Sequence, residues 1–199
     1  MPSRVEIIEK VIAYKKFFFK LEEARFKHEL YNGEMSDELL RLNLERGDSA
    51  AVVMYDTAKD SVILTEQFRY PTYEKGPGWI LEIPAGTIEK SENRDPTVTL
   101  RREIMEEIGY STRALRHICT FYVSPGGTSE RIHLYYTQVS PKDKAAEGGG
   151  IIGEGEDIRV LTIKLAEALG MIAGGKIVDA KTIIGLQWLQ LNRNRLQTR

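Results

Sequence analysis

Three glutamates in one predicted helix have the spacing of a divalent-metal site. Glu103 and Glu107 lie four positions apart, and Glu106 lies three positions after Glu103. Residues at these spacings share a helix face, so the carboxylates would repel one another. A hard cation that prefers oxygen ligands would relieve this repulsion. Arg102 could hold one carboxylate through a bidentate contact. The alternative interpretation is a solvated acidic face without a ligand.

The residues around these glutamates resemble the signature of the Nudix hydrolase superfamily, G-x5-E-x7-R-E-U-x-E-E-x-G-U, where U is bulky and apolar. Gly86 and Glu92 match its first half, and residues 102–110 match its second half, with Tyr110 at the last position. Nine residues separate Glu92 from Arg102 where the signature has seven. The two extra residues fall in the loop before Pro96, so the helix part of the signature is complete. The role of Glu92 stays open.

The resemblance implies a metal-dependent hydrolase that uses Mg²⁺ or Mn²⁺ as its cofactor. Members cleave the diphosphate of a nucleoside diphosphate linked to another group. A metal ion suits this reaction because it neutralises phosphate charge and lowers the pKa of bound water. The implied metal ligands are the carbonyl of Ala85 and the carboxylates of Glu103, Glu106, Glu107, Glu130 and Glu156.

The implied catalytic residues are Glu103, Glu107 and Glu156. Glu156 would be a metal ligand or the base that activates water. Glu154 and Asp157 are alternatives, because the glycine-rich loop that contains them is two residues longer than in similar proteins. A mobile acidic loop without a catalytic role is the remaining interpretation.

Segments outside the signature resemble one branch of the family, the nucleoside-diphosphate-sugar pyrophosphatases. Residues 67–69, 82–86 and 124–127 resemble its arginine-bearing strand end, its E-x-P-A-G segment and its S-P-G loop. Glycines 148–150 before an acidic segment resemble the members that cleave GDP-mannose. ADP-ribose is equally compatible with the other segments. The implied substrate contacts are Arg69, Ala85, Gly86, Arg41 and Phe17.

Two other functions are weighed against this one. The first is another Nudix reaction, such as cleavage of NADH or a dinucleoside polyphosphate, against which the sugar-nucleotide segments argue. The second is a non-catalytic nucleotide-binding Nudix module. Such modules usually lack carboxylates of the signature, which are present here.

The elements that position these residues follow from capping and periodicity. Asp95 and Pro96 suit the start of a helix over 96–109 that Gly109 ends. The resemblance implies an α/β fold, an α/β/α sandwich around a mixed sheet, preceded by an N-terminal antiparallel β hairpin. Strands are expected at 50–55, 61–69, 79–84, 114–123, 131–139 and 158–163, and further helices at 165–173 and 180–191.

The expected organisation is a hairpin at 1–46, a Nudix domain at 47–191 and a polar tail at 192–199. Segments 17–26 and 39–44 form the hairpin, and Asn32-Gly33 marks its turn. An isolated hairpin is marginal in water, so it must pack on the main domain or on a second copy of the chain. In the family branch this hairpin is exchanged within a homodimer, which makes a homodimer the expected assembly.

Composition excludes several other classes. The 199 residues carry 28 basic and 29 acidic side chains, a net charge of −1, which argues against a nucleic-acid partner. The single cysteine, Cys119, excludes an intrachain disulfide and favours the reducing cytoplasm. No apolar run approaches the ~20 residues that a membrane helix needs, so no membrane association is expected. The partner that the family resemblance implies is a small-molecule nucleotide sugar.

Overall fold

The computed structural model describes residues 1–89, 95–112, 114–151, 153 and 155–197. The chain divides into two compact units. The first comprises Met1–Asp48 and Tyr122–Arg131, and the second comprises Ser49–Phe121 and Ile132–Arg199. The loop at 122–131 thus groups with the N-terminal strands, although it lies inside the segment expected to form the Nudix domain.

The second unit is built on a seven-stranded sheet with the central order β10-β5-β4-β9-β8, in which β6 pairs with β5 and β7 with β4. Strand β4 runs parallel to β9 and antiparallel to β5 and β7, so the sheet is mixed, as expected. The strands are β4 (Ser49–Asp56), β5 (Ser61–Phe68), β6 (Trp79–Glu82), β7 (Ala85–Thr87), β8 (Arg116–Tyr122), β9 (Arg131–Gln138) and β10 (Arg159–Lys164).

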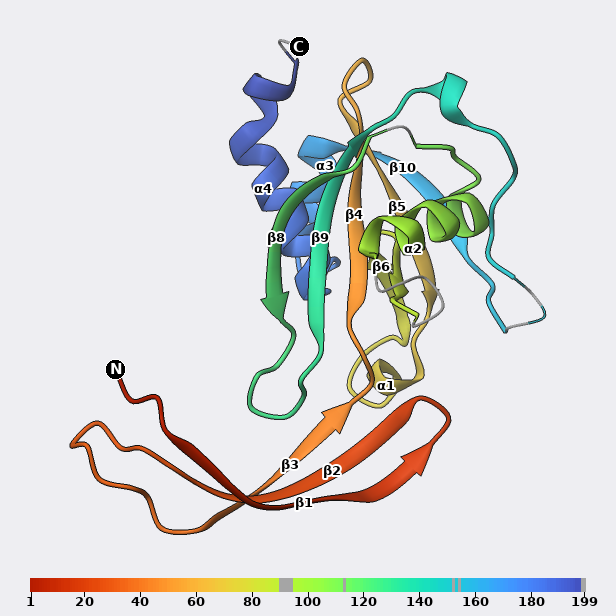
Figure 1. Ribbon diagram of the computed structural model, residues 1–199. Helices are drawn as coiled ribbons and strands as arrows, with labels where there is room; N and C mark the ends of the chain where they lie inside the picture. Colours follow the sequence, from red (N-terminus) through yellow and green to blue (C-terminus); the bar gives the residue numbers. More distant parts are fainter. Residues whose placement is uncertain (90–94, 113, 152, 154, 198–199) are drawn as a thin grey trace. The chain divides into compact units, whose positions relative to one another are not determined.

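Helices cover both faces of this sheet (Figure 1). The helices are α1 (Tyr70–Tyr73), α2 (Pro96–Glu103), α3 (Leu165–Ala173) and α4 (Ala180–Gln197), with a short 3-10 helix at Pro141–Asp143. Alternate side chains of the fully buried strand β4 divide between two cores. Val53 and the residues two positions before and after it pack with residues of α3 and α4. Val52 and the residues two positions before and after it pack with Leu100 of α2. The expected α/β/α sandwich is therefore confirmed.

The helix that bears the glutamates begins as expected and ends differently. The Asp95 carboxylate accepts a hydrogen bond from the Thr97 N–H at 2.9 Å and caps α2. The expected helix to Gly109 is present, but its last part is a π-helical turn, η2 (Ile104–Ile108), instead of α-helix. Gly109 then ends it with a left-handed φ of 74°. Such wider turns are frequent at functional sites.

The first unit contains a three-stranded antiparallel sheet, β1 (Val5–Lys16), β2 (Phe19–His28) and β3 (Leu39–Glu45), in that order. The expected pairing of the segments around Ala24 and Arg41 is confirmed. The expected connection at Asn32-Gly33 does lie between these paired strands, but the expected hairpin lacked β1 and the turn after it. The tight turn follows β1, where Phe17 has a φ of 53°, and Asn32-Gly33 lies in the longer connection from β2 to β3.

The last helix also exceeds the expectation, since α4 continues past Leu191 to Gln197. Side-chain contacts that a local pattern does not reveal hold this extension. The Asn192 amide donates to the Trp188 carbonyl at 2.9 Å, and Arg193 pairs with Asp60 at 2.7 Å. Among the described residues, no helix is both long and apolar enough to cross a membrane.

Candidate active site

Two buried glutamates form the centre of the candidate site. Glu103 ends α2 and Glu107 lies in η2, with exposed fractions of 9% and 3%. Burial and, to a lesser extent, the charges of Glu103 and Glu156 raise the pKa of Glu107 to about 8. Burial likewise raises the pKa of Glu103 to about 7, against the charge of Arg102. Oε2 of Glu107 has no hydrogen-bond partner within the part of the chain that the structure describes. At this pair, burial and like charges outweigh the nearby cations Arg102 and Arg69.

Arg102 holds two of the signature carboxylates. Its guanidinium lies 3.0 Å from the Glu103 carboxylate and 2.9 Å from that of Glu106, the latter across one helical turn. The expected contact thus exists, but it bridges two glutamates instead of gripping one with both nitrogens. Glu106 is only half-buried, which places it at the margin of the pair.

The donor set fits a divalent metal ion, although the full ligand set is not assembled. Across the described ranges, no group of three or more His, Cys, Asp or Glu side chains is arranged to hold a metal. Oε2 of Glu107 has no hydrogen-bond partner among the described residues, and the raised pKa values of Glu103 and Glu107 show that nearby cations compensate these carboxylates only in part. Carboxylate oxygens are the ligands that Mg²⁺ and Mn²⁺ favour.

Gly86 makes room for Glu103. Gly86 lies in β7 and pairs with Ala50 of β4. A Cβ atom at this position would lie 2.1 Å from Oε1 of Glu103 and 2.3 Å from its Cγ. Only a residue without a side chain therefore lets Glu103 approach β7, where Ala85 is the neighbouring residue. This contact gives the first glycine of the signature a physical reason.

The glycine-rich loop binds the end of the glutamate-bearing helix. The Gly149 N–H donates to the Glu107 carbonyl at 2.8 Å, and the Gly150 N–H donates to that of Glu106 at 3.2 Å. A Cβ on Gly148 would lie 2.6 Å from the Glu107 carbonyl oxygen. Further donors to the carbonyls of Ile108 and Gly109 are Lys144 Nζ and the N–H groups of Ala145 and Ala146. The segment 144–150 is therefore anchored to the end of this helix, whereas the catalytic role expected of the acidic residues that follow it stays a prediction.

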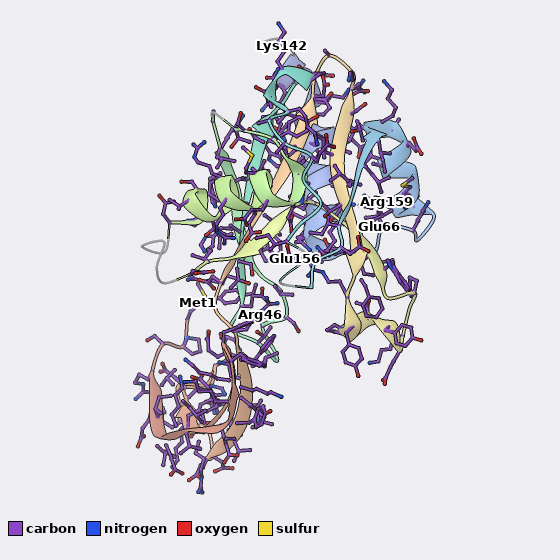
Figure 2. All side chains as sticks on the ribbon, turned by 90° about the vertical axis from the view of Figure 1, so that its right-hand side faces the viewer. Met1, Arg46, Glu66, Lys142, Glu156 and Arg159 are labelled. Atoms are coloured by element: carbon purple, nitrogen blue, oxygen red, sulfur yellow. The ribbon has the colours of Figure 1, made fainter. Side chains whose placement is uncertain are left out.

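Glu156 is held in the same loop. Its Oε2 accepts a hydrogen bond from the Ile151 N–H at 3.0 Å, and the Ile158 N–H donates to the Gly149 carbonyl at 3.1 Å. Figure 2 labels Glu156 on this loop. Its charge acts on both Glu103 and Glu107, which brings it to the same site. The alternative Glu154, and Glu92 of the signature, lie outside the described residues.

Arg69 lies beside the carboxylate pair. It follows β5, and its Nε donates to Oε1 of Glu82 at 2.5 Å. Glu82 and, more weakly, Glu107 raise the pKa of Arg69 against the effect of burial. Glu82 also pairs with Lys181 at the start of α4. No sequence motif assigns a role to Glu82 or Lys181. Asp179 accepts a hydrogen bond from the Thr182 N–H and so caps α4, which places Lys181 in its first turn.

The other expected site residues lie in the first unit. Glu130 pairs with Arg46 at 3.5 Å, and Phe17 is 81% exposed at its turn. Arg41 helps to line a pocket of about 490 Å³ with Asn43 and residues of the S-P-G loop. The expected metal role of Glu130 and the expected substrate contacts of Arg41 and Phe17 stay predictions.

The raised pKa values predict how metal-free stability changes with pH. Glu103 and Glu107 have folded pKa values of about 7 and 8, above the ordinary 4.5, so the folded chain binds more protons between these limits. The free energy of unfolding should therefore fall as pH rises through this range. We expect a lower Tm at pH 8.5 than at pH 5.5 in EDTA, measured by circular dichroism. Added Mg²⁺ should raise the Tm more at pH 8.5.

The control for this prediction is the double variant Glu103→Gln and Glu107→Gln, which cannot titrate at either position. It should lose most of the difference between the two pH values. The assignment of the pH effect to this pair is contradicted when wild type and double variant show the same pH dependence.

Comparison with known proteins identifies the family. The NUDIX domain family matches residues 45–183. The chain therefore belongs to the Nudix family, which confirms the resemblance in its sequence. In fold it is also similar to the crystal structure of an ADP compounds hydrolase, with a TM-score of 0.70 and 18% identity over 94% of this chain and 95% of that chain.

Curated relatives match nearly the whole chain. The ADP-ribose pyrophosphatase of Escherichia coli K12 is 39% identical over 97% of this chain and 91% of the relative. That of Haemophilus influenzae is 40% identical over 97% and 89%. The GDP-mannose pyrophosphatase of Pectobacterium atrosepticum is 36% identical over 94% of each chain. The similarity thus extends to proteins of both expected specificities.

Proposed function

We propose that the protein is a metal-dependent hydrolase that cleaves the diphosphate bond of a nucleoside diphosphate sugar. The products would be a nucleoside monophosphate and a sugar phosphate. The observation that carries this proposal is the buried pair Glu103 and Glu107, with an unpartnered carboxylate oxygen in the Nudix helix. Relatives that cover the chain almost completely are named ADP-ribose pyrophosphatase and GDP-mannose pyrophosphatase.

Each residue of the site would have a separate role in the proposed hydrolysis. A bound Mg²⁺ or Mn²⁺ would neutralise the diphosphate and lower the pKa of a bound water. Glu103 and Glu107 would hold this ion, with Glu106 and the Ala85 carbonyl at its margin. Arg69 would bind phosphate oxygens through its terminal nitrogens. Glu156 would accept the proton of the attacking water.

The sugar nucleotide is either ADP-ribose or GDP-mannose. The triple glycine of the loop resembles GDP-mannose-cleaving members, but its hydrogen bonds to the carbonyls of Glu106 and Glu107 give it a role that needs no particular sugar. The experiment is turnover of both compounds side by side with Mg²⁺, with chromatography of the products. AMP with ribose 5-phosphate, or GMP with mannose 1-phosphate, would support the proposal. Turnover of neither, with NADH cleaved instead, would contradict it.

Glu156 as the base for water has its own test. Glu156→Gln should lower kcat about 100-fold, because the attacking water loses its proton acceptor. Mn²⁺ binding, measured by calorimetry, should change less. Glu154→Gln is the matched control, since it removes the neighbouring charge of the same loop. A loss of kcat in Glu154→Gln with normal turnover in Glu156→Gln would instead assign the base to Glu154.

We also propose that the first unit forms a homodimer. Every residue of β1 is exposed, including apolar side chains such as Ile7, Val11 and Tyr14. Contiguous exposed apolar surface of this kind is typical of an interface. Sedimentation should give a dimer at micromolar concentration, and Ile7→Glu combined with Val11→Glu should shift it to a monomer. A monomeric wild type contradicts the proposal.

The free Cys119 fits a reducing cytoplasm, where we place the reaction.

A further inference from the structure

Lys181 is a buried cation to which the proposed reaction assigns no task. Its exposed fraction is 9%, and its Nζ donates to Oε2 of Glu82 and lies 3.1 Å from Oδ1 of Asp179. A buried lysine is costly unless its charge is paired. Its place in the first turn of α4 therefore needs an explanation beyond packing.

The surrounding hydrogen bonds fix Lys181 from two sides. The Thr182 hydroxyl donates to Oδ2 of Asp179 at 2.5 Å and accepts a hydrogen bond from the Ile83 N–H at 2.8 Å. The Thr182 N–H also donates to Asp179, at 3.0 Å. The start of α4 is thus tied to the backbone immediately after Glu82. Lys181 and Glu82 are held by neighbouring, independently bonded segments.

Glu82 is shared between two cations. Oε1 accepts from Nε of Arg69 at 2.5 Å, and Oε2 accepts from Lys181. Burial acts to raise the pKa of Glu82, but Lys181 and Arg69 outweigh it and lower the pKa below its ordinary value. Within the described part of the chain, the Arg69 side chain donates through Nε alone, so its terminal nitrogens remain free for a ligand.

We propose that Lys181 is a positioning residue that holds Glu82, and through it Arg69, in the orientation that binds the diphosphate. The inference rests on the proposed function, because it takes Arg69 as the phosphate contact. Without Lys181, Oε2 of Glu82 has no cation and its carboxylate is free to rotate. Arg69 would then lose the fixed acceptor that directs its terminal nitrogens. Lys181 itself does not touch the substrate.

The test is Lys181→Met, which keeps the length of the side chain and removes its charge. KM should rise about tenfold, the loss expected for a displaced charge-assisted contact, with a smaller change in kcat. The increase should be equal for ADP-ribose and GDP-mannose, because the diphosphate is common to both. Mn²⁺ affinity should not change. Lys176→Met, at an exposed lysine of the preceding loop, is the control and should have no effect.

A double-mutant cycle separates positioning from direct contact. Lys181→Met should add little to Glu82→Gln, because both act through Arg69. Full additivity would overturn the inference, because Lys181 would then act independently of Glu82. An effect confined to one sugar would also overturn it and would make Lys181 a sugar contact. If Lys181→Met does not fold, Lys181→Arg provides the second test: it keeps the charge and should keep a KM near that of wild type, whereas a tenfold increase would overturn the role.

The failure of this inference can be told from failure of the proposed function. Arg69→Met should raise KM for both substrates. If the wild type cleaves neither compound, the proposed function fails. If Arg69→Met is impaired and a folded Lys181→Met behaves like wild type, only the role of Lys181 fails.

Discussion

Glu107→Gln is expected to reduce turnover by about a thousandfold or more while the chain still folds. Glutamine has the size of glutamate but cannot supply a negative oxygen to a cation. The stabilisation that a metal ion gives to phosphoryl transfer amounts to several kcal/mol, which corresponds to this loss. The measurement is kcat with saturating Mg²⁺ for the substrate that the wild type cleaves.

The folded state should not suffer, because Glu107 is 3% exposed and its Oε2 has no hydrogen-bond partner among the residues described. Removal of a buried, uncompensated charge should leave the Tm in EDTA unchanged or higher at pH 8.5. Glu66→Gln, at a glutamate that pairs with Arg159 where β5 meets β10 (Figure 2), is the control and should keep full turnover. Turnover like that of wild type in Glu107→Gln would contradict the metal role.

Gly86→Ala is expected to cost about 100-fold in kcat/KM, although it adds only one methyl group and removes no charged group. The new Cβ would lie 2.1 Å from Oε1 of Glu103, so the Glu103 side chain must leave its position. Displacement of a catalytic group by about 1 Å can cost this much. Mn²⁺ affinity, measured by calorimetry, should fall with the activity.

Gly170→Ala provides the matched control for this change. Gly170 lies in α3, where an added Cβ meets nothing within 4 Å. Alanine there should leave kcat/KM unaltered and raise the free energy of unfolding by roughly 0.5–1 kcal/mol, because glycine is a poor helix residue. Normal metal affinity and activity in Gly86→Ala would show that Glu103 does not need its present position.

The sandwich was predictable because its signals are local and regular. In β4 the side chains of successive residues such as Val52 and Val53 are apolar on both sides, as in a strand buried on both faces. Asp95 and Pro96 marked the start of α2 correctly. The failures arose where tertiary contacts override a local signal: Phe17 occupies a positive-φ turn that its type disfavours.

The candidate site divides in the same way. The spacing of Glu103 and Glu107 on one helix was visible in the sequence, and the helix brings both into the buried site. The pairing of Glu82 with Lys181 joins residues 99 positions apart, so no local pattern could reveal it. The π-helical turn η2 was also unpredictable, because its apolar residues Ile104 and Ile108 suit an α-helix equally well.

The anchored loop has a consequence for comparing family members of different length. The Ile158 N–H donates to the Gly149 carbonyl and so closes the loop that contains Glu156. The Ile151 N–H donates to the Glu156 carboxylate and so fixes this side chain within the loop. Residues inserted between these anchors lengthen the closed segment without moving its ends, and lengthening a loop costs little free energy. The place of this carboxylate is thus set by its hydrogen bond from the Ile151 N–H rather than by residue count. Alignments should be pinned at Gly149 and Ile158, and the gap placed between them.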